Sequence, residues 1–166
     1  MNPYVEVVHE SGAPISRTGL TELAEAVLES EGCNGALTIV VVGEDLMTDL
    51  NLRYRGAEGP TDVLSFTEMD HRDAWPAIGH DAKQRRGECS PLGEMVICPA
   101  VVRAYAEEDG VTPAYQLGWT VVHGTLHLLG YDHETDKGEM RSRETVLLEL
   151  FADMLDGLIF PLGPQT

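Results

Sequence analysis

The chain has 166 residues, of which 43% are hydrophobic and 23% charged, and it carries three cysteines and a formal net charge of −17. This length and hydrophobic content allow the chain to bury its own core, which excludes an intrinsically disordered protein. Three cysteines without a CxxC pair argue against a secreted disulfide scaffold and a cysteine-only zinc site. The negative charge repels nucleic acids and anionic membranes at long range, so composition alone argues against a nucleic-acid partner.

The N-terminal segment and the apolar runs predict where the protein resides. Residues 1–10 show neither the basic region nor the apolar region of a signal peptide. No apolar run approaches the roughly 18 residues that suggest a membrane span. We therefore expect a cytoplasmic protein without a membrane partner.

Strand and helix patterns are mixed throughout the chain. Runs rich in β-branched residues predict strands at 4–9, 37–42, 62–66 and 95–98. Apolar residues at helical spacing predict helices at about 20–28, 44–54, 99–106, 113–129 and 139–154. The fourth of these helices is apolar nearly all round, so we expect it to be central and buried. These elements predict an α/β (α+β) fold, a single compact domain over residues 1–166 with one small sheet and about five helices.

Two helix starts and one long loop complete this prediction. Thr18 is the expected N-cap of the first helix, and Asp136 and Glu139 form a capping-box-like pair before the last. The last helix is expected to be amphipathic, with an apolar face of Val146, Leu147, Leu150, Phe151 and Met154. The stretch at about 68–91 fits no element and is expected to be a functional or flexible insertion. It contains a basic run of Lys83, Arg85 and Arg86.

Three histidines within eleven residues form the sharpest motif of the sequence. His123 and His127 are four residues apart on the buried helix, so their side chains point the same way. Gly130 permits the turn that brings His133 toward them. Three imidazoles that converge at the end of a buried helix predict a metal site with its fourth position open to water.

The chemistry of these ligands favours zinc, although nickel, copper or iron also bind three histidines. Cys98 could act as a fourth ligand, but a small buried core residue is the more frequent role for such a cysteine. The same histidine spacing occurs in metzincin proteases, whose motif begins HExxH and uses the glutamate as general base. Gly124 stands at that position here, which argues against a peptidase.

A second cluster joins the end of a helix to the start of a strand. Arg53 lies in the last turn of the helix predicted at 44–54, and Arg55 directly follows this helix. An arginine at a helix end either binds a phosphate or offsets the helix dipole. Asp62 stands just before the strand, where an aspartate is most often a turn residue. Spacing alone favours the structural role for each of these residues.

Three segments resemble the YbeY family of bacterial metal-dependent endoribonucleases. They are the run from His123 to His133, the arginine cluster with 60–66 after it, and the segment 92–98. The resemblance extends over about residues 36–155 and implies a small mixed sheet. It also implies single-strand-specific RNA cleavage, with a role in 16S ribosomal RNA 3′-end maturation and ribosome quality control.

The resemblance also assigns roles to individual residues. It implies that His123, His127 and His133 hold a zinc ion and that His123 belongs to the catalytic centre. Arg55 would contact the scissile phosphate, and the neighbouring Arg53, which the resemblance does not assign, is a further candidate for RNA binding. The attacking group stays open between a water-derived hydroxide and the RNA 2′-OH, because no carboxylate is visibly placed as general base.

Some residues depart from the family pattern or keep two interpretations. Thr67 replaces the usual proline, and the segment 68–91 is longer than expected, which affects the shape of the substrate groove. Asp132 either orients a ligand histidine or forms a turn, and Tyr131 is expected to pack.

Two other functions remain open, a metallopeptidase and a non-catalytic ribosome-assembly factor with structural zinc. The net charge predicts weak, salt-sensitive binding to free RNA. Local binding would depend on the arginines and the basic run, and proteins of the small ribosomal subunit would deliver the enzyme.

Overall fold

The structure is a computed structural model that describes residues 3–67 and 91–160. The expected insertion lies outside the described residues except for Pro91, and so does its basic run of Lys83, Arg85 and Arg86. In the described part, no helix is long and apolar enough to cross a membrane.

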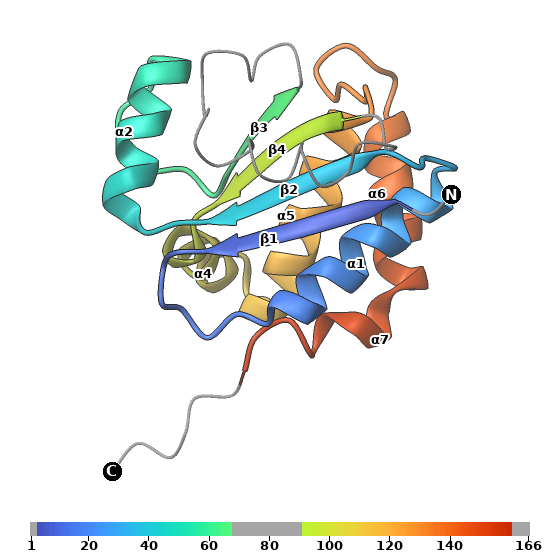
Figure 1. Cartoon of the computed structure of the whole chain (residues 1–166), viewed down its shortest axis with the longest axis horizontal. Coiled ribbons are helices and arrows are strands. Elements are labelled where there is room, and N and C mark those ends of the chain that lie inside the picture. Colours follow the sequence, from blue (N-terminus) through green and yellow to red (C-terminus); the bar gives the residue numbers. More distant parts are fainter. Residues whose placement is uncertain (1–2, 68–90, 161–166) are drawn as a thin grey trace.

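Four strands form one mixed sheet, as Figure 1 shows. The strands are β1 (Tyr4–His9), β2 (Ala36–Val41), β3 (Val63–Thr67) and β4 (Pro91–Ile97). Their order across the sheet is β1-β2-β4-β3. β1 and β4 run parallel to β2 on either side of it, whereas β3 pairs with β4 in the antiparallel direction. The prediction of a small mixed sheet is therefore confirmed.

The helices are α1 (Arg17–Ser30), α2 (Glu44–Arg55), α4 (Pro99–Asp109), α5 (Pro113–Leu128), α6 (Glu139–Leu150) and α7 (Ala152–Leu155). The N-cap of α5 is Thr112, whose hydroxyl accepts a hydrogen bond from the backbone N–H of Tyr115 at 3.1 Å. The prediction of Thr18 as the cap of α1 is wrong. Ser16 caps this helix instead, because its hydroxyl accepts from the N–H of Gly19 at 2.9 Å and Thr18 is already helical.

The sheet separates two hydrophobic cores. Side chains alternate between the faces of a strand, so Ile39 of β2 packs with α1 and α5, whereas Val40 packs on the opposite face with Met47 and Leu50 of α2. All four side chains are fully buried. Both faces of β2 are therefore covered, as its continuous apolar run predicts.

Helix α5 lies at the centre of the larger core, where it contacts α1, α4, α6, β3 and β4. It approaches β4 closely at Gly124, where an added Cβ would lie 2.8 Å from the sulfur of Met95. The prediction of a central, buried helix is confirmed. Its depth in the fold gives the side chains at its C-terminal end a rigid support.

The prediction of a single last helix is wrong in part. α6 ends at Leu150 and α7 starts at Ala152, with Phe151 outside helical geometry between them (φ −106°, ψ 21°). Val146 and Leu150 are 48% and 62% exposed, because α6 instead packs through other side chains, which are Met140, Leu147 and Leu148.

The expected capping box before α6 is also absent. The N-cap position of α6 is Gly138, which offers no side-chain cap. The carboxylate of Asp136 accepts hydrogen bonds from the N–H groups of Gly138 and Met140 at 2.8 and 2.9 Å. Asp136 thus satisfies the donors of the first turn from outside the helix.

Candidate metal centre

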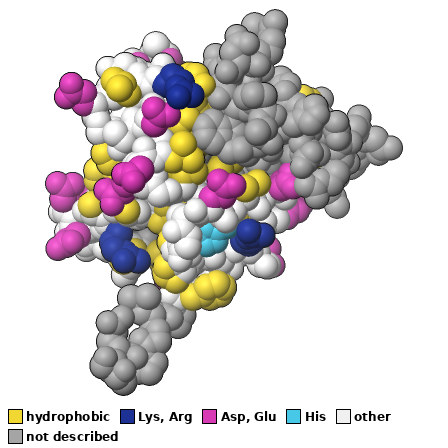
Figure 2. Space-filling model, turned by 60° about the vertical axis from the view of Figure 1, so that its left-hand side comes forward, with side chains coloured by type: hydrophobic (Ala, Val, Ile, Leu, Met, Phe, Trp, Pro, Cys, Tyr) yellow, Lys and Arg dark blue, Asp and Glu magenta, His cyan; other side chains and the backbone are white. Residues whose placement is uncertain are grey.

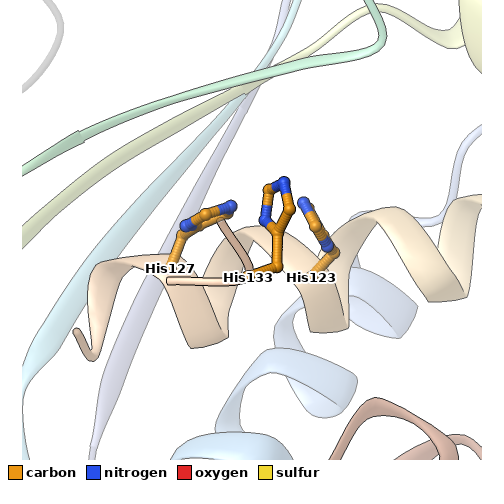
Figure 3. Close-up of side chains that lie close together, drawn as sticks. All are labelled: His123, His127 and His133. Carbon is orange, nitrogen blue, oxygen red and sulfur yellow. The ribbon is translucent and has the colours of Figure 1, made fainter. Parts of the chain in front are cut away.

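The three histidines of the motif converge at the C-terminal end of α5 (Figure 3). His123 and His127 project from one face of the helix, and His133 follows in the loop after it. One ring nitrogen from each can be chosen so that all three lie within 4.8 Å of one another. This group can hold a metal ion, since imidazole nitrogens are common ligands of transition metals.

The turn after α5 brings His133 to the other two histidines. Gly130 adopts a positive φ of 102°, which favours glycine because it lacks a Cβ. Its N–H donates to the carbonyl of His127 at 3.0 Å, and the N–H of Tyr131 donates to that of Leu126 at 3.1 Å. These bonds end the helix and reverse the chain, as the sequence predicts.

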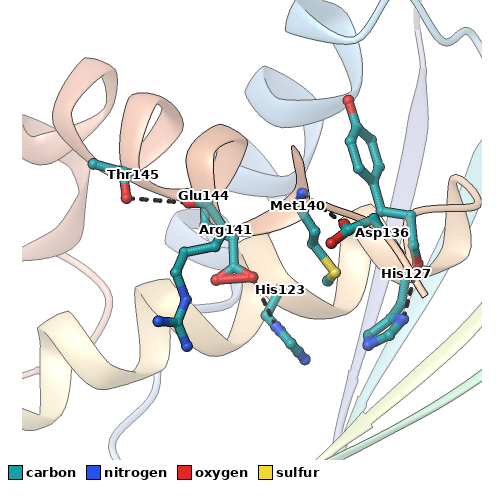
Figure 4. Close-up of polar contacts among 8 residues, drawn as sticks. His123, His127, Asp136, Met140, Arg141, Glu144 and Thr145 are labelled. Carbon is teal, nitrogen blue, oxygen red and sulfur yellow. Dashed lines mark hydrogen bonds and ion pairs between the residues drawn. The ribbon is translucent and has the colours of Figure 1, made fainter. Parts of the chain in front are cut away.

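Two of the three histidines, His123 and His127, have a hydrogen-bond partner at the ring nitrogen Nδ1 (Figure 4). Nδ1 of His127 lies 3.1 Å from the backbone carbonyl oxygen of Tyr131. A carbonyl can only accept, so this Nδ1 carries the proton and Nε2 keeps a lone pair for an ion. Nδ1 of His123 lies 3.0 Å from Oε1 of Glu144, a buried carboxylate of α6. Such outer partners fix the orientation of metal ligands.

Burial lowers the pKa of His127 below its ordinary value, and the neighbouring His123 and His133 lower it further. The lowered pKa favours the neutral form of the His127 imidazole. A neutral imidazole needs no proton release before it binds a metal. Its protonation state thus fits a metal ligand.

Sequence reasoning missed Glu144 and left Asp132 open between a partner of the histidines and a turn residue. Asp132 forms a turn, because its carboxylate accepts from the N–H of Glu134 at 3.0 Å and its carbonyl accepts from those of Thr135 and Asp136. No sequence signal pointed to Glu144, which lies 21 residues beyond His123 and reaches it only through the packing of α6 on α5.

Tyr131 packs against the larger core, as expected, and also makes a polar link. Its hydroxyl donates to Oε1 of Glu31 at 2.7 Å, and Oε2 of Glu31 accepts from Nε of Arg143 at 2.6 Å. These contacts tie the turn after α5 to the end of α1 and to α6. The loop that carries His133 is thereby anchored on two sides.

A cavity of about 350 Å³ opens beside the histidines. It is lined by residues of both clusters predicted from the sequence, the histidine motif and the segment with the arginines. Its lining includes all three histidines together with Arg55 from the end of α2 and Asp62 just before β3. Gly56 ends α2 in a left-handed conformation (φ 66°), directly after Arg55. The arginine is exposed and makes no ion pair with any residue that the structure describes. The sequence did not predict that Asp62 lies in the same cavity.

Asp62 combines a turn role with a place in this cavity. Its Oδ1 accepts from the N–H of Val63 at 2.9 Å and from the hydroxyl of Thr61 at 3.3 Å. Burial raises the pKa of Asp62 above its ordinary value, and these hydrogen bonds offset part of the effect. The cavity thus contains a carboxyl group whose proton is held more tightly than in water.

The other candidate site residues from the sequence, Arg53 and Cys98, do not line this cavity. Arg53 forms an exposed pair with Asp49 at 3.1 Å and does not line the cavity, so its role in substrate binding stays a prediction. Cys98 is fully buried in the smaller core, which supports a packing role. Within the described residues, the group that could hold a metal consists of the three histidines alone.

The fold and the site together define an α/β protein with a candidate metal centre at the end of a buried helix. The family model of Endoribonuclease YbeY matches residues 8–152 of the chain. The Endoribonuclease YbeY of Frankia alni is 43% identical over 133 residues, which cover 78% of this chain and 71% of that protein. The Endoribonuclease YbeY of Brevibacillus brevis is 35% identical over 150 residues, which cover 87% of this chain and 94% of that protein. The chain belongs to the YbeY family.

The fold also has a counterpart among solved structures. The solution structure of TM1509 from Thermotoga maritima aligns with a TM-score of 0.61 at 26% sequence identity. The alignment covers 98% of this chain and 99% of that one.

Proposed function

We propose that this protein is a zinc-dependent endoribonuclease that cleaves single-stranded RNA. The observation that carries the proposal is the shared cavity of Arg55, Asp62 and the three histidines, in a chain that belongs to the YbeY family. The relatives named Endoribonuclease YbeY support RNA as the substrate. The resemblance to the family supports a role in 16S ribosomal RNA 3′-end maturation and ribosome quality control.

Each side chain around the cavity has a defined part in this proposal. His123, His127 and His133 would hold the zinc ion, with Glu144 and the Tyr131 carbonyl fixing the orientation of two rings. A zinc ion bound there supplies a Lewis acid that stabilises negative charge on the phosphate. The guanidinium of Arg55 would bind the phosphate through two parallel hydrogen bonds, a bidentate contact. This contact becomes stronger as negative charge develops on the phosphate in the transition state.

Proton transfer falls to Asp62 in this proposal. A carboxyl group with a raised pKa takes up a proton more readily than an ordinary aspartate, which suits a general base. It would accept the proton of the attacking hydroxyl, whether from water or from the RNA 2′-OH, as the new phosphorus–oxygen bond forms. The phosphorus–oxygen bond to the leaving strand then breaks, and the leaving oxygen takes up a proton from solvent. The product ends distinguish the two: a 2′,3′-cyclic phosphate indicates attack by the 2′-OH, and a direct 5′-phosphate indicates attack by water.

Recruitment to RNA requires more than charge. At a net charge of −17 the protein gains no long-range attraction to a polyanion. We propose that small-subunit ribosomal proteins deliver the enzyme to its RNA in the bacterial cytoplasm. Binding to naked RNA is then weak and salt-sensitive.

The geometry argues against the metallopeptidase alternative. The position that carries the base in HExxH proteases is Gly124, and a side chain there would meet Met95 in the core. A glutamate at this position would point toward the sheet rather than into the cavity. The catalytic glutamate of that protease class therefore cannot be accommodated at this position.

The test of the proposal is cleavage of a precursor of 16S ribosomal RNA by the purified, zinc-loaded protein. We expect cuts in single-stranded regions, no cuts in a duplex control, and loss of cleavage with a chelator. Intact single-stranded RNA after incubation with a preparation shown to contain zinc would contradict the proposal and favour a non-catalytic assembly factor.

A further inference from the structure

A second cavity, of about 510 Å³, lies next to the first and shares Trp119, His123 and His133 with it. Its other lining residues come from α5 and α6. They are Tyr115, Arg141, Glu144, Thr145 and Leu148. The proposed reaction uses none of the side chains Tyr115, Trp119 and Arg141, so their place beside the histidines calls for another role.

Aromatic rings form one side of this cavity. The ring of Trp119 stacks on that of His123 with 4.5 Å between centroids and 19° between planes. Tyr115, one helical turn earlier on α5, also lines the cavity and is 41% exposed. In proteins that bind single-stranded nucleic acids, exposed aromatic rings serve as stacking platforms for unpaired nucleobases, because every base presents a flat π-face.

A cation lies on the other side of the cavity. Arg141 is exposed and forms no ion pair with any residue in 3–67 or 91–160, whereas Arg143 of the same helix is paired with Glu31. In Figure 4 the Arg141 side chain extends toward the side of α5 on which the His123 ring lies. A guanidinium that is unpaired among the described residues is available to bind a phosphate.

We propose that this second cavity binds one nucleotide of single-stranded RNA next to the cleaved bond. Its base stacks on Tyr115 and Trp119, and its phosphate binds Arg141. The proposal rests on the proposed function, since it takes RNA as the substrate. It also explains a preference for single strands, because the faces of a base within a duplex are already covered by its neighbours. Stacking contributes affinity that the net charge of the protein does not oppose.

The experiment measures binding of a labelled, cleavage-resistant single-stranded oligonucleotide by fluorescence anisotropy, and KM and kcat with a cleavable one. The variants are Tyr115→Ala, Tyr115→Phe and Arg141→Gln. The matched controls are Phe160→Ala and Arg103→Gln, which alter an exposed aromatic and an exposed arginine in a separate cavity. All of the substituted side chains are exposed, so folding should be preserved.

We expect Tyr115→Ala to weaken binding about tenfold and to raise KM more than it changes kcat. Tyr115→Phe keeps the ring and should bind like the wild type. Arg141→Gln should reduce the slope of log affinity against log salt by about 0.7, the value for one lost phosphate contact with a single strand. An abasic substitution next to the cut should weaken wild-type binding but add little to the loss in Tyr115→Ala.

Equal binding by Tyr115→Ala, Arg141→Gln and the two controls would overturn the proposed subsite. This result is distinct from failure of the proposed function, in which the wild type cleaves no RNA. The anisotropy comparison does not depend on cleavage and decides the subsite in either case.

Discussion

Oε1 of Glu144 lies 3.0 Å from Nδ1 of His123, so a buried carboxylate on α6 holds a candidate metal ligand on α5. We expect Glu144→Ala to lower zinc affinity about 10- to 100-fold, because the His123 ring loses the hydrogen-bond partner that orients it. The zinc affinity of Glu144→Gln should lie between those of Glu144→Ala and the wild type, since the amide oxygen of glutamine still accepts a hydrogen bond. The measurement is zinc affinity in competition with a chelator.

The control for this prediction is Glu149→Gln, which changes an exposed glutamate of the same helix. It should bind zinc like the wild type. If Glu144→Ala also bound zinc with wild-type affinity, the carboxylate would have no role at the metal centre.

Arg55 should act on the substrate and not on the metal. We expect Arg55→Ala to lower the rate of RNA cleavage by about 10²- to 10³-fold, the typical cost of removing a donor that stabilises transition-state charge. Its zinc content should equal that of the wild type, because Arg55 belongs to the cavity lining and not to the histidine group. Arg103→Ala serves as the control for loss of an exposed arginine. A zinc-loaded Arg55→Ala protein with full activity would remove this residue from the mechanism.

The close approach of α5 to β4 predicts the effect of a side chain at Gly124. We expect Gly124→Ala to destabilise the protein by about 1–2 kcal/mol, because the cost of overpacking exceeds the gain in helix propensity. The measurement is the free energy of unfolding in urea. The same substitution should cost less in a Met95→Ala background, because the atoms that the new Cβ would meet are then gone. An equal cost in both backgrounds would show that Met95 is not the cause.

The raised pKa of Asp62 predicts a pH-dependent effect on stability in the metal-free protein. Burial raises this pKa above the unfolded value, so the folded state holds the proton more tightly and its relative stability falls as pH rises through the folded pKa. Asp62→Asn, which stays neutral, should therefore be more stable than the wild type near neutral pH, and this advantage should vanish toward about pH 4. Denaturant unfolding at several pH values measures the difference. A constant difference across pH would contradict a raised pKa.

Local sequence patterns predicted the features that depend on local geometry. The spacing of His123 and His127 with a glycine turn before His133 was sufficient to predict their convergence, because helix periodicity and the turn fix the directions of the side chains. The strands and the buried helix α5 followed from the apolar pattern in the same way. The resemblance to the family, and not the spacing, assigned a functional role to Arg55.

The features that sequence reasoning missed depend on packing between distant segments. Glu144 on α6 hydrogen-bonds to His123 on α5. Asp62 lines the same cavity as histidines that lie about 60 residues further along the chain. Sequence periodicity does not reveal contacts over such separations. The exposure of Leu150 was missed because the contacts of α6 with α5 determine which face of α6 is buried. The break at Phe151 was missed because the apolar pattern continues through it. Tertiary context overrode the local pattern at these positions.

The central claim is that the three histidines hold the metal and that Arg55 acts on the RNA held beside it. The direct test measures zinc content and cleavage of one single-stranded RNA in the same preparations of wild type, His127→Ala and Arg55→Ala. The account predicts about one zinc per chain and cleavage in the wild type. It predicts loss of both in His127→Ala, and retained zinc without efficient cleavage in Arg55→Ala. Full cleavage by a His127→Ala protein that contains no zinc would contradict it.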